Sequence, residues 1–398
     1  MARELTDLGA PDVRSENGSV TFGGGLDTLV KANMWLRCAD RVWVRLARFK
    51  ALTFEELFQG VKAIAWPDLL GRDACFPVEG SSHESQLSSV PACQAVTKKA
   101  IVESLKRAYK TEWFDERGPQ FKVRVSLVRD EVTISLDSSG SGLHKRGYRT
   151  LTAEAPIRET LAAGLVLLSV WKPERVLVDP FCGSGTIPIE AAFIGLRRAP
   201  GLRRAFASEG WPFVGKARWD AVRADAEDAF DRRTKLQITG HDDDEGVLRL
   251  ARQHLRQADL VERGVHFRAQ PVNAFRSTHE YGVIITNPPY GERLGEIRDA
   301  ERLYESLGQV VRPLRTWSVY VITSHPRFER FYGQSLVKKR KLYNGLIVAW
   351  YYQFVGPRPP RVDAGDRGVG PRPPRVDRDD GGVGPRPPRK NAGDGSES

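Results

Sequence analysis

Three short segments contain residue types that could bind a cofactor and hold an amino group. They are DPFCGSGT (179–186), GHDDD (240–244) and NPPY (287–290). Each lies at the end of an apolar run that we expect to form a buried strand. Ligands of open α/β sheets bind outside the carboxyl ends of the strands, so these segments are the first candidates for a functional site.

The first segment reads as a glycine-rich turn between a strand that ends at Asp179 and a helix that begins near Thr186. Gly183 and Gly185 let a ligand approach the backbone, and the amino end of the helix favours a carboxylate or another anionic group. The spacing is neither the G-x-G-x-x-G of a dinucleotide site nor that of a P-loop with its lysine. The pattern therefore disfavours both of those ligand classes.

The second segment again runs from a strand through a glycine and acidic residues into a helix. An acidic side chain at this point can accept hydrogen bonds from two ribose hydroxyls. Asp242 is the first candidate and Asp244 the second, while strand alternation directs Asp243 elsewhere. The alternative is that these aspartates cap the helix expected from Glu245.

The third segment follows the apolar run GVIIT (282–286). Proline cannot donate a hydrogen bond to a neighbouring strand, so the strand should stop at Asn287. One interpretation is a plain strand-ending turn. The other is a binding corner, and the two segments upstream favour it.

In this order the three segments resemble those of class I S-adenosylmethionine-dependent methyltransferases that act on exocyclic amino groups. The resemblance is closer to bacterial rRNA guanine-N2 methyltransferases that carry a THUMP RNA-binding domain. Residues 76–109 are similar to their THUMP region, and GLHKRGYR (142–149) with APIRETLAAGLVLLSVW (155–171) is similar to their entry into the catalytic domain. The resemblance covers about residues 3 to 355.

The resemblance implies that S-adenosylmethionine is the cofactor and that the third segment holds the target amine. The implied cofactor-binding residues are Asp179, Pro180, Phe181, Gly183, Ser184, Gly185, Thr186, Asp242, Asp244 and Asn287, and the implied catalytic residues are Asn287, Pro288, Pro289 and Tyr290. The expected reaction is methylation of a guanine N2 amine in 23S rRNA. The alternatives are a tRNA guanine-N2 enzyme, a DNA adenine-N6 enzyme, which shares NPPY, and an inactive RNA-binding assembly factor.

The chemistry explains these residue types. The lone pair of a guanine N2 amine is delocalised into the ring, which makes the amine a poor nucleophile. Two fixed acceptors at its N–H groups, the Asn287 side-chain oxygen and the Pro288 carbonyl, would free that lone pair. The prolines hold the acceptors in place, and Tyr290 can stack on the base.

Three features depart from the family pattern. The expected third strand ends at Pro271 where an acidic residue is usual, so Gln270 or Asn273 would have to contact the adenine. An insertion rich in Arg and Trp (195–233) could be a lid over the substrate or a structural elaboration. The chain also starts inside the expected first helix, so the first module could be incomplete.

Alternating strand and helix patterns predict the domain organisation. We expect a ferredoxin-like module (1–55), a THUMP domain (56–150), an α/β Rossmann-like methyltransferase domain (151–355) and a disordered Pro/Arg/Gly/Asp repeat tail (356–398). The catalytic sheet should have seven mostly parallel strands and a closing antiparallel hairpin that turns at Asn344–Gly345, preceded by an α+β RNA-binding region.

The net charge of +11 and the pI of about 9.5 favour an anionic partner, with RNA expected. The candidate RNA contacts are Lys98, Lys99, Lys106, Arg107, Lys145, Arg146 and Arg293, although a solvated helix face is the alternative for any one lysine. The cysteines and histidines are dispersed, so we expect no disulfide and no metal. The first residues resemble no signal peptide and no apolar run could span a bilayer, which predicts a cytoplasmic protein.

Overall fold

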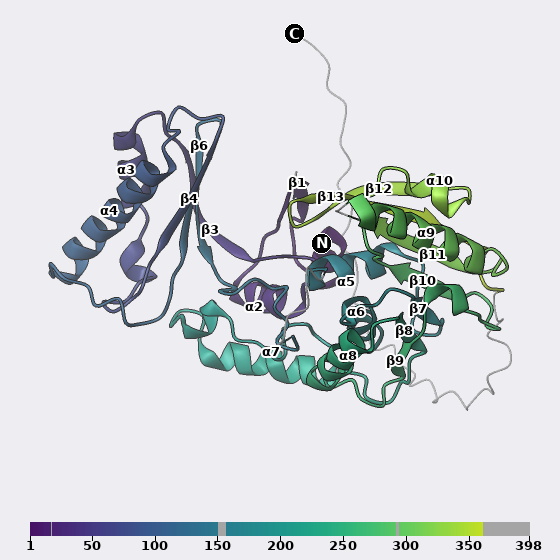
Figure 1. Cartoon of the computed structure of the whole chain (residues 1–398). Helices are drawn as coiled ribbons and strands as arrows, with labels where there is room; N and C mark the ends of the chain where they lie inside the picture. The colour runs from purple at the N-terminus through teal and green to yellow at the C-terminus, as the bar shows by residue number, and fades with distance from the viewer. Residues whose placement is uncertain (17, 150–156, 292–293, 361–398) are drawn as a thin grey trace, which may run out of the picture. The chain divides into compact units, whose positions relative to one another are not determined.

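The computed structural model describes residues 1–16, 18–149, 157–291 and 294–360 (Figure 1). Met1–Arg358 form one compact unit, and a second unit comprises Pro359–Ser398. The predicted repeat tail therefore lies, from residue 361 onward, outside the described residues. No helix in the described part of the chain is long and apolar enough to cross a membrane.

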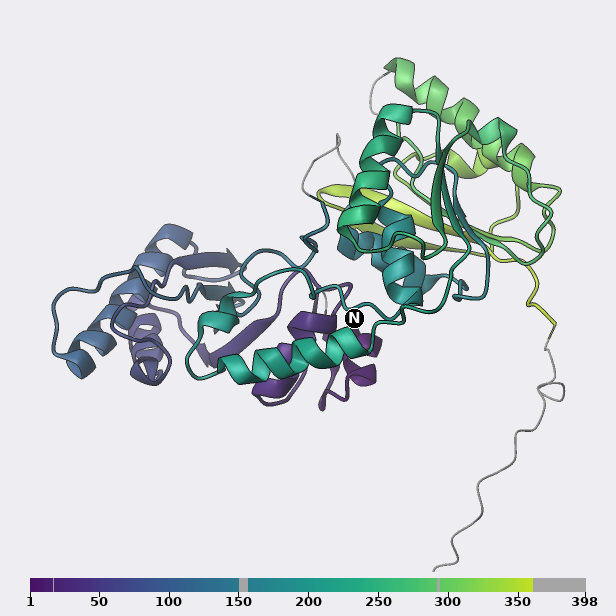
Figure 2. The same ribbon diagram turned by 90° about the horizontal axis from the view of Figure 1, so that it is seen from below.

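A sheet of seven strands organises the second half of the first unit (Figure 2). Its order is β12-β13-β11-β10-β7-β8-β9, with parallel pairing from β11 through β9 and antiparallel pairing of β13 with β11 and with β12. The strands are β7 Leu177–Asp179, β8 Ile238–Asp242, β9 Val265–Ala269, β10 Val283–Thr286, β11 Ser318–Thr323, β12 Lys338–Asn344 and β13 Ile347–Phe354. This confirms the predicted Rossmann-like fold with its antiparallel closing hairpin.

The two faces of this sheet pack against different helices. Val283 and Ile285 belong to a core with α5, α6 and α8, whereas Ile284 between them belongs to a core with α9 and α10. Strand alternation produces this division, and each buried aliphatic side chain stabilises the fold by about 1.5–3 kcal/mol. The helices are α5 Glu159–Leu168, α6 Thr186–Gly195, α8 Glu245–Gln257, α9 Leu294–Val311 and α10 Phe328–Tyr332.

The first half begins with helices and a small hairpin, followed by a second sheet of order β3-β6-β5-β4. Its elements are α1 Ala2–Asp7, β1 Arg14–Glu16, β2 Ser19–Thr21, α2 Leu26–Trp35, β3 Trp43–Lys50, α3 Phe54–Lys62, the short 3₁₀ turn η1 Trp66–Asp68, β4 Val78–His83, α4 Val90–Tyr109, β5 Val123–Val128 and β6 Glu131–Asp137. β3 pairs with β6, so this sheet crosses the expected domain boundary at residue 55.

The insertion at 195–233 is a structural element. It contains η2 Ala207–Gly210 and α7 Lys216–Asp228, and its apolar residues join the core of the first half. Trp211 stacks on Phe121 with ring centroids 5.2 Å apart, and Phe206 stacks on Trp219 at 4.7 Å. These contacts support the structural alternative rather than a lid.

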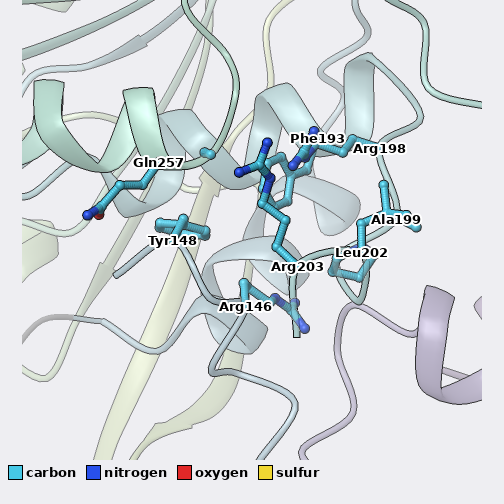
Figure 3. Close-up of a pocket in the computed structure, with 10 residues that line it drawn as sticks. Arg146, Tyr148, Phe193, Arg198, Ala199, Leu202, Arg203 and Gln257 are labelled. Carbon is cyan, nitrogen blue, oxygen red and sulfur yellow. The ribbon is translucent and has the colours of Figure 1, made fainter. Parts of the chain in front are cut away.

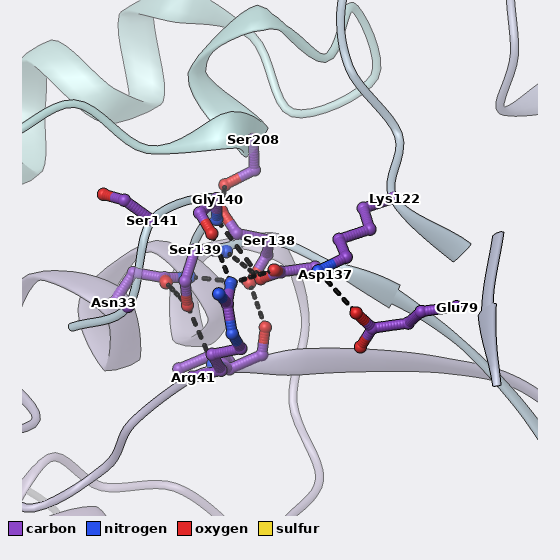
Figure 4. Close-up of polar contacts among 12 residues, drawn as sticks. Asn33, Arg41, Glu79, Lys122, Asp137, Ser138, Ser139, Gly140, Ser141 and Ser208 are labelled. Atoms are coloured by element: carbon purple, nitrogen blue, oxygen red, sulfur yellow. Dashed lines mark hydrogen bonds and ion pairs between the residues drawn. The ribbon is translucent and has the colours of Figure 1, made fainter. Parts of the chain in front are cut away.

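Polar contacts at the end of β6 attach the insertion to the first half (Figure 4). The Ser208 hydroxyl and amide both donate to the Ser138 carbonyl, at 2.9 and 3.1 Å. Asn33 of α2 donates to the Ser138 hydroxyl at 2.9 Å and accepts from Ser139 at 2.7 Å. These bonds satisfy buried polar groups where three segments distant in sequence meet.

The turn of the closing hairpin differs from the prediction by one residue. Asn344 pairs with Ile347, so the two turn residues are Gly345 and Leu346. Gly345 has φ of +65°, a left-handed conformation that glycine adopts without a Cβ penalty. The Asn-Gly signal therefore marked the hairpin correctly but not which residues form its turn.

Candidate active site

The three predicted segments meet at one edge of the seven-stranded sheet. β10, β7 and β8 are adjacent and parallel, with Ile284 opposite Val178 and Asp179 opposite Gly240. Their carboxyl ends therefore emerge side by side, and each end leads into one of the segments. Topology brings together residues that are more than a hundred positions apart in sequence.

Asp179 ends β7 and is 1% exposed. Its Oδ1 accepts a hydrogen bond from the Thr286 hydroxyl at 2.6 Å and one from the Phe181 amide at 3.2 Å. Burial raises the pKa of Asp179 to about 7, against the opposing effect of these two bonds and with a further increase from nearby Asp242. A cationic ligand beside this carboxyl would favour its ionised form.

The glycine-rich turn has the backbone geometry that the sequence suggested. Gly183 has φ of +50° with open space where a Cβ would be, and Gly185 has φ of +84°. A Cβ on Gly185 would lie 2.6 Å from the Phe267 ring, so this position excludes any side chain. Pro180, Ser184 and Thr186 are buried and Phe181 is half-buried, and α6 begins at Thr186 as predicted.

Asp242 connects β8 to the glycine-rich turn. Its Oδ2 accepts from the Gly183 amide at 2.9 Å and its Oδ1 from the Asp244 amide at 3.2 Å. Burial raises its pKa, and the same two amide bonds oppose the rise. A carboxylate offers about four acceptor positions, so this half-buried side chain keeps capacity for ribose hydroxyls.

Asp244 is the N-cap of α8. Its Oδ1 accepts from the Gly246 amide at 2.6 Å and from the Val247 amide at 3.3 Å. The capping alternative is thus correct for Asp244, and its contact with a ribose stays a prediction. Asp243 is exposed.

Two residues that the sequence analysis did not identify, Tyr304 and Thr323, stabilise the NPPY segment. The Tyr304 hydroxyl donates to the Pro289 carbonyl at 2.7 Å and lies 3.1 Å from the Thr323 hydroxyl. Tyr304 belongs to α9 and Thr323 ends β11, so helix and strand together fix the segment. Nothing in the sequence distinguishes Tyr304 from an ordinary core aromatic, whereas a threonine at the end of a fully buried strand could have been recognised.

Within the segment, the Tyr290 hydroxyl donates to the Asn287 side-chain oxygen at 2.7 Å. Asn287 and Tyr290 are half-buried, Pro288 is buried and Pro289 is exposed. The hydrogen bond orients the amide, because only its oxygen can accept from a hydroxyl. Asn287 therefore presents a defined acceptor at the edge where Asp179 lies.

β9 is the next strand after β8, and its carboxyl end lies at the same edge of the sheet. The Gln270 backbone N–H donates to the Asp242 backbone carbonyl at 2.9 Å, which places Gln270 next to Asp242, the residue expected to bind the ribose. Pro271 leads into the short 3₁₀ turn η3 Val272–Ala274, and Asn273 is exposed. Gln270 also lines a cleft of about 510 Å³ on the exposed face of β8 and β9.

Cys182 does not have the properties of a nucleophile. It is 6% exposed, and burial raises the pKa of its thiol well above the usual value. A buried protonated thiol is inert, which agrees with a packing role in the glycine-rich turn. Among the described residues no cluster of histidine, cysteine, aspartate and glutamate could hold a metal ion.

The predicted RNA-contacting residues divide into two groups. Lys98 pairs with Glu116 and lies 3.9 Å from the centroid of the Phe76 ring, and Lys106 pairs with Glu112. Lys99, Arg107 and Lys145 are exposed. Arg293 lies outside the described residues.

Arg146 corrects the sequence prediction. It is 3% exposed and its guanidinium pairs with Glu190 at 3.3 Å. It also donates to the Leu143 and Arg37 carbonyls. Arg146 and Tyr148 are among the residues that line a small pocket (Figure 3). The side chain is used inside the protein and is not available to RNA.

The sequence pattern of the RMKL-like methyltransferase domain matches residues 146–352. The chain belongs to this methyltransferase family. The THUMP domain pattern matches residues 51–137, and the RlmL ferredoxin-like domain pattern matches residues 1–43.

Two curated relatives of the RMKL-like family illustrate the range of similarity. A putative RNA methyltransferase of Bacillus subtilis strain 168, YpsC, is 48% identical over 356 residues, which cover 89% of this chain and 92% of the relative. The ribosomal RNA large subunit methyltransferase K/L of Syntrophotalea carbinolica is 34% identical over 373 residues, 87% of this chain and 50% of the relative. The chain thus spans about half the length of the K/L protein.

Solved structures agree with the RMKL-like family. SMU.472, a putative methyltransferase complexed with SAH, has a TM-score of 0.85 and 42% identity, covering 90% of this chain and 95% of its own. A predicted N6-adenine-specific DNA methylase from Listeria monocytogenes has a TM-score of 0.86 and 47% identity, covering 89% and 92%. The prediction of a class I methyltransferase that contains a THUMP domain, uses S-adenosylmethionine and belongs with RNA-modifying enzymes is confirmed.

The residues at the sheet edge fit this cofactor. Asp179 is a buried carboxyl with no cationic partner among the described residues, which suits the positively charged groups of the cofactor. An open glycine at Gly183 leaves room for a ligand, and Asp242 offers acceptors to a ribose. The assignment of individual residues to parts of the cofactor remains a prediction.

Proposed function

We propose that the protein transfers the methyl group of S-adenosylmethionine to the N2 amine of a guanine in 23S rRNA. The observation that carries this proposal is the corner at Asn287, whose neighbour Thr286 is hydrogen-bonded to Asp179 at 2.6 Å. An acceptor for an amine and a site for a methyl donor thus share one edge of the sheet. The THUMP domain supports RNA over DNA, and the name of the K/L relative supports large-subunit rRNA.

The corner would act by orienting the amine. The Asn287 oxygen already accepts the Tyr290 hydroxyl, and its second lone pair can accept one amine N–H. The Pro288 carbonyl accepts the other N–H. With both N–H groups fixed, the nitrogen lone pair points away from the ring plane toward the methyl group, and the rigid prolines keep the acceptors preorganised.

When bound, S-adenosylmethionine supplies an electrophilic methyl group, so no strong general base is needed in the chain. Asp179, the glycine-rich turn and Asp242 hold and orient the cofactor. The guanine must leave its stack to reach Asn287, which costs a few kcal/mol in a duplex and less in a loop.

Product identification tests the function. The protein is incubated with labelled S-adenosylmethionine and unmodified rRNA, tRNA or DNA, and the labelled nucleoside is identified by mass spectrometry. N2-methylguanosine in 23S rRNA is the expected product. N2-methylguanosine in tRNA alone would move the substrate to tRNA, and N6-methyladenine in DNA would refute the proposal.

Variants of the corner test the mechanism. Asn287→Ala should lower the turnover number by roughly 10²- to 10³-fold, the range for losing a preorganised polar contact, and should lower cofactor affinity much less, because Asp179, the glycine-rich turn and Asp242 remain. Tyr290→Phe keeps the ring but removes the bond to Asn287, whereas Tyr290→Ala removes both. If Tyr290 stacks on the base, Phe should keep far more activity than Ala, and equal losses would mean that the hydroxyl alone matters.

A further inference from the structure

The tip of the β12–β13 hairpin exposes large apolar side chains. Leu346 is 100% exposed and Tyr343 is 60% exposed, and Ile347 and Val348 are 39% and 40% exposed. Tyr343 and Val348 are a cross-strand pair, so they lie on the same side of the hairpin. Ile347 pairs with Asn344, so it lies on the other side of the hairpin. Scattered apolar side chains are common on surfaces, but Tyr343 and Val348 on one side, next to Leu346 at the turn, form a patch that a partner can cover.

The strand that leads to this tip is strongly basic. Lys338, Lys339, Arg340 and Lys341 are all exposed, and β12 is the edge strand of the sheet. In the described part of the chain only Lys339 of these four forms an ion pair, with Glu329 at 2.8 Å. Lys341 lies 5.7 Å from the centroid of the Tyr343 ring, which places a cation beside an exposed aromatic face.

Protection of the sheet edge explains the basic residues of β12 but not the apolar side chains at the hairpin tip. Lysines and arginines on an edge strand prevent pairing with other chains, and β12 fits that explanation. An apolar tip has the opposite effect because it promotes association. The combination of unpaired cations with exposed aromatic and aliphatic groups matches surfaces that bind phosphates and stack on bases.

The hairpin also extends beyond the edge where the candidate active site lies. Thr323, the last residue of β11, pairs with Trp350, so Ile347 is three positions further along. At about 3.3 Å per residue the tip projects roughly 10 Å beyond the end of β11. Thr323 contacts Tyr304, which holds the Pro289 carbonyl, so the base of the hairpin and the NPPY segment share one support.

We propose that the β12–β13 hairpin is an RNA-binding arm that holds the strand flanking the target nucleotide. Arg340 and Lys341 contact backbone phosphates, and Tyr343 with Leu346 packs against an exposed base. This inference rests on RNA as the substrate and adds a surface that does not depend on which base is methylated.

Two double variants test the arm in the full-length protein. Tyr343→Ala/Leu346→Ser removes the apolar tip, and Arg340→Glu/Lys341→Glu reverses the charge. Matched controls are Val261→Ser, 50% exposed after α8, and Lys235→Glu, exposed just before β8. Both control positions lie at the amino ends of the parallel strands, at the opposite edge from Asn287.

Affinity is measured by fluorescence anisotropy with a short labelled single-stranded RNA at low and high salt. The tip variant should bind about tenfold more weakly, as expected for a lost base stack. The charge variant should also reduce the dependence of log K on log salt by about 1.4, because each phosphate contact contributes about 0.7 in single strands. The controls should match the wild type, and S-adenosylmethionine affinity should be unchanged in all four variants.

Wild-type RNA affinity in both arm variants would overturn the proposal. If the tip variant at the same time changed the sedimentation coefficient of the protein, the patch would be a contact between two copies. Because RNA binding is measured without methyl transfer, the result stands even if the methylated nucleoside is not N2-methylguanosine. Failure of the proposed function and failure of the arm are therefore distinguishable.

Discussion

Asp179 and Glu190 are two buried carboxyl groups on consecutive elements, and they differ in whether a cation neutralises their charge. Glu190 on α6 is 0% exposed and receives the Arg146 guanidinium and the Tyr148 hydroxyl, each at 3.3 Å. Asp179 is equally inaccessible, but its partners are the Thr286 hydroxyl and the Phe181 amide. Among the described residues no cation pairs with it, and its pKa rises to about 7.

We interpret this difference as one between a structural charge at Glu190 and a proposed cofactor-binding carboxyl at Asp179. A buried charge that the chain neutralises itself holds the fold together, and removing its partner is strongly unfavourable. A buried carboxyl that the chain leaves without a cation is a candidate for binding a ligand that brings one, and this is the role we propose for Asp179. Four predictions test this distinction, beginning with the largest effect.

Arg146→Met should lower the free energy of unfolding by about 3–5 kcal/mol, because it leaves Glu190 buried without its counter-charge. Methionine keeps much of the side-chain volume, so the loss reports charge more than packing. Urea denaturation followed by circular dichroism measures it. The double variant Arg146→Met/Glu190→Gln should recover a large part of the loss, and no recovery would mean that the Arg146 bonds to the Leu143 and Arg37 carbonyls matter more than the pair.

Asp179→Asn should weaken S-adenosylmethionine binding by roughly 10- to 100-fold, the effect of losing a charge-assisted hydrogen bond. The unliganded variant should remain folded, because an amide can accept the Thr286 bond at the same position. Isothermal titration calorimetry gives the affinity and thermal unfolding the stability. If Asp179→Asn lowered the melting temperature strongly but left S-adenosylmethionine affinity unchanged, the roles assigned to Asp179 and Glu190 would be reversed.

The sequence predicted the methyltransferase fold well because its signals are local. Strand ends, glycines and the proline pair are recognised from a few consecutive residues, and the structure brings the three segments to one sheet edge. The turn at Gly345–Leu346 was displaced by one residue because the Asn-Gly signal does not determine strand register. The support from Tyr304 was missed because it depends on the packing of α9, which no short pattern encodes.

Basic residues were the least predictable part of the site. Arg146 and Lys98 were expected to face RNA. Arg146 is buried against Glu190, whereas Lys98 pairs with Glu116 at the surface and its contact with RNA stays a prediction. The exposed cations of β12 were not identified. A sequence gives the number of charges but not their partners, because ion pairs form between residues distant in sequence. The distance between Arg146 and Glu190 is 44 positions along the chain.

The pH dependence of binding gives a second test of the Asp179 assignment. Since its folded-state pKa of about 7 is above the unfolded value of 3.8, the unliganded protein gains stability from this group below pH 3.8 and loses it as pH rises through about 7. Cofactor binding should show the opposite trend, because a cation prefers the ionised carboxylate. The dissociation constant of S-adenosylmethionine should therefore increase as the pH falls below 7, by up to about tenfold per pH unit, which is the limit for one proton. Asp179→Asn should abolish this pH dependence.

The smallest expected effects concern two adjacent lysines of α4, and they extend the same comparison to cations. Lys98 contacts Glu116, the Phe76 carbonyl and the Phe76 ring within the chain. Lys99 is exposed, and its Nζ lies at the longer distance of 5.9 Å from the Phe58 ring centroid. Lys98→Ala should lower the melting temperature with little change in RNA affinity. Lys99→Ala should do the reverse, with a loss of about two- to threefold at low salt that disappears at high salt. Equal effects of the two variants on RNA binding would mean that an internal partner does not withdraw a cation from a ligand, and the distinction drawn from Asp179 and Glu190 would then hold only for fully buried charges.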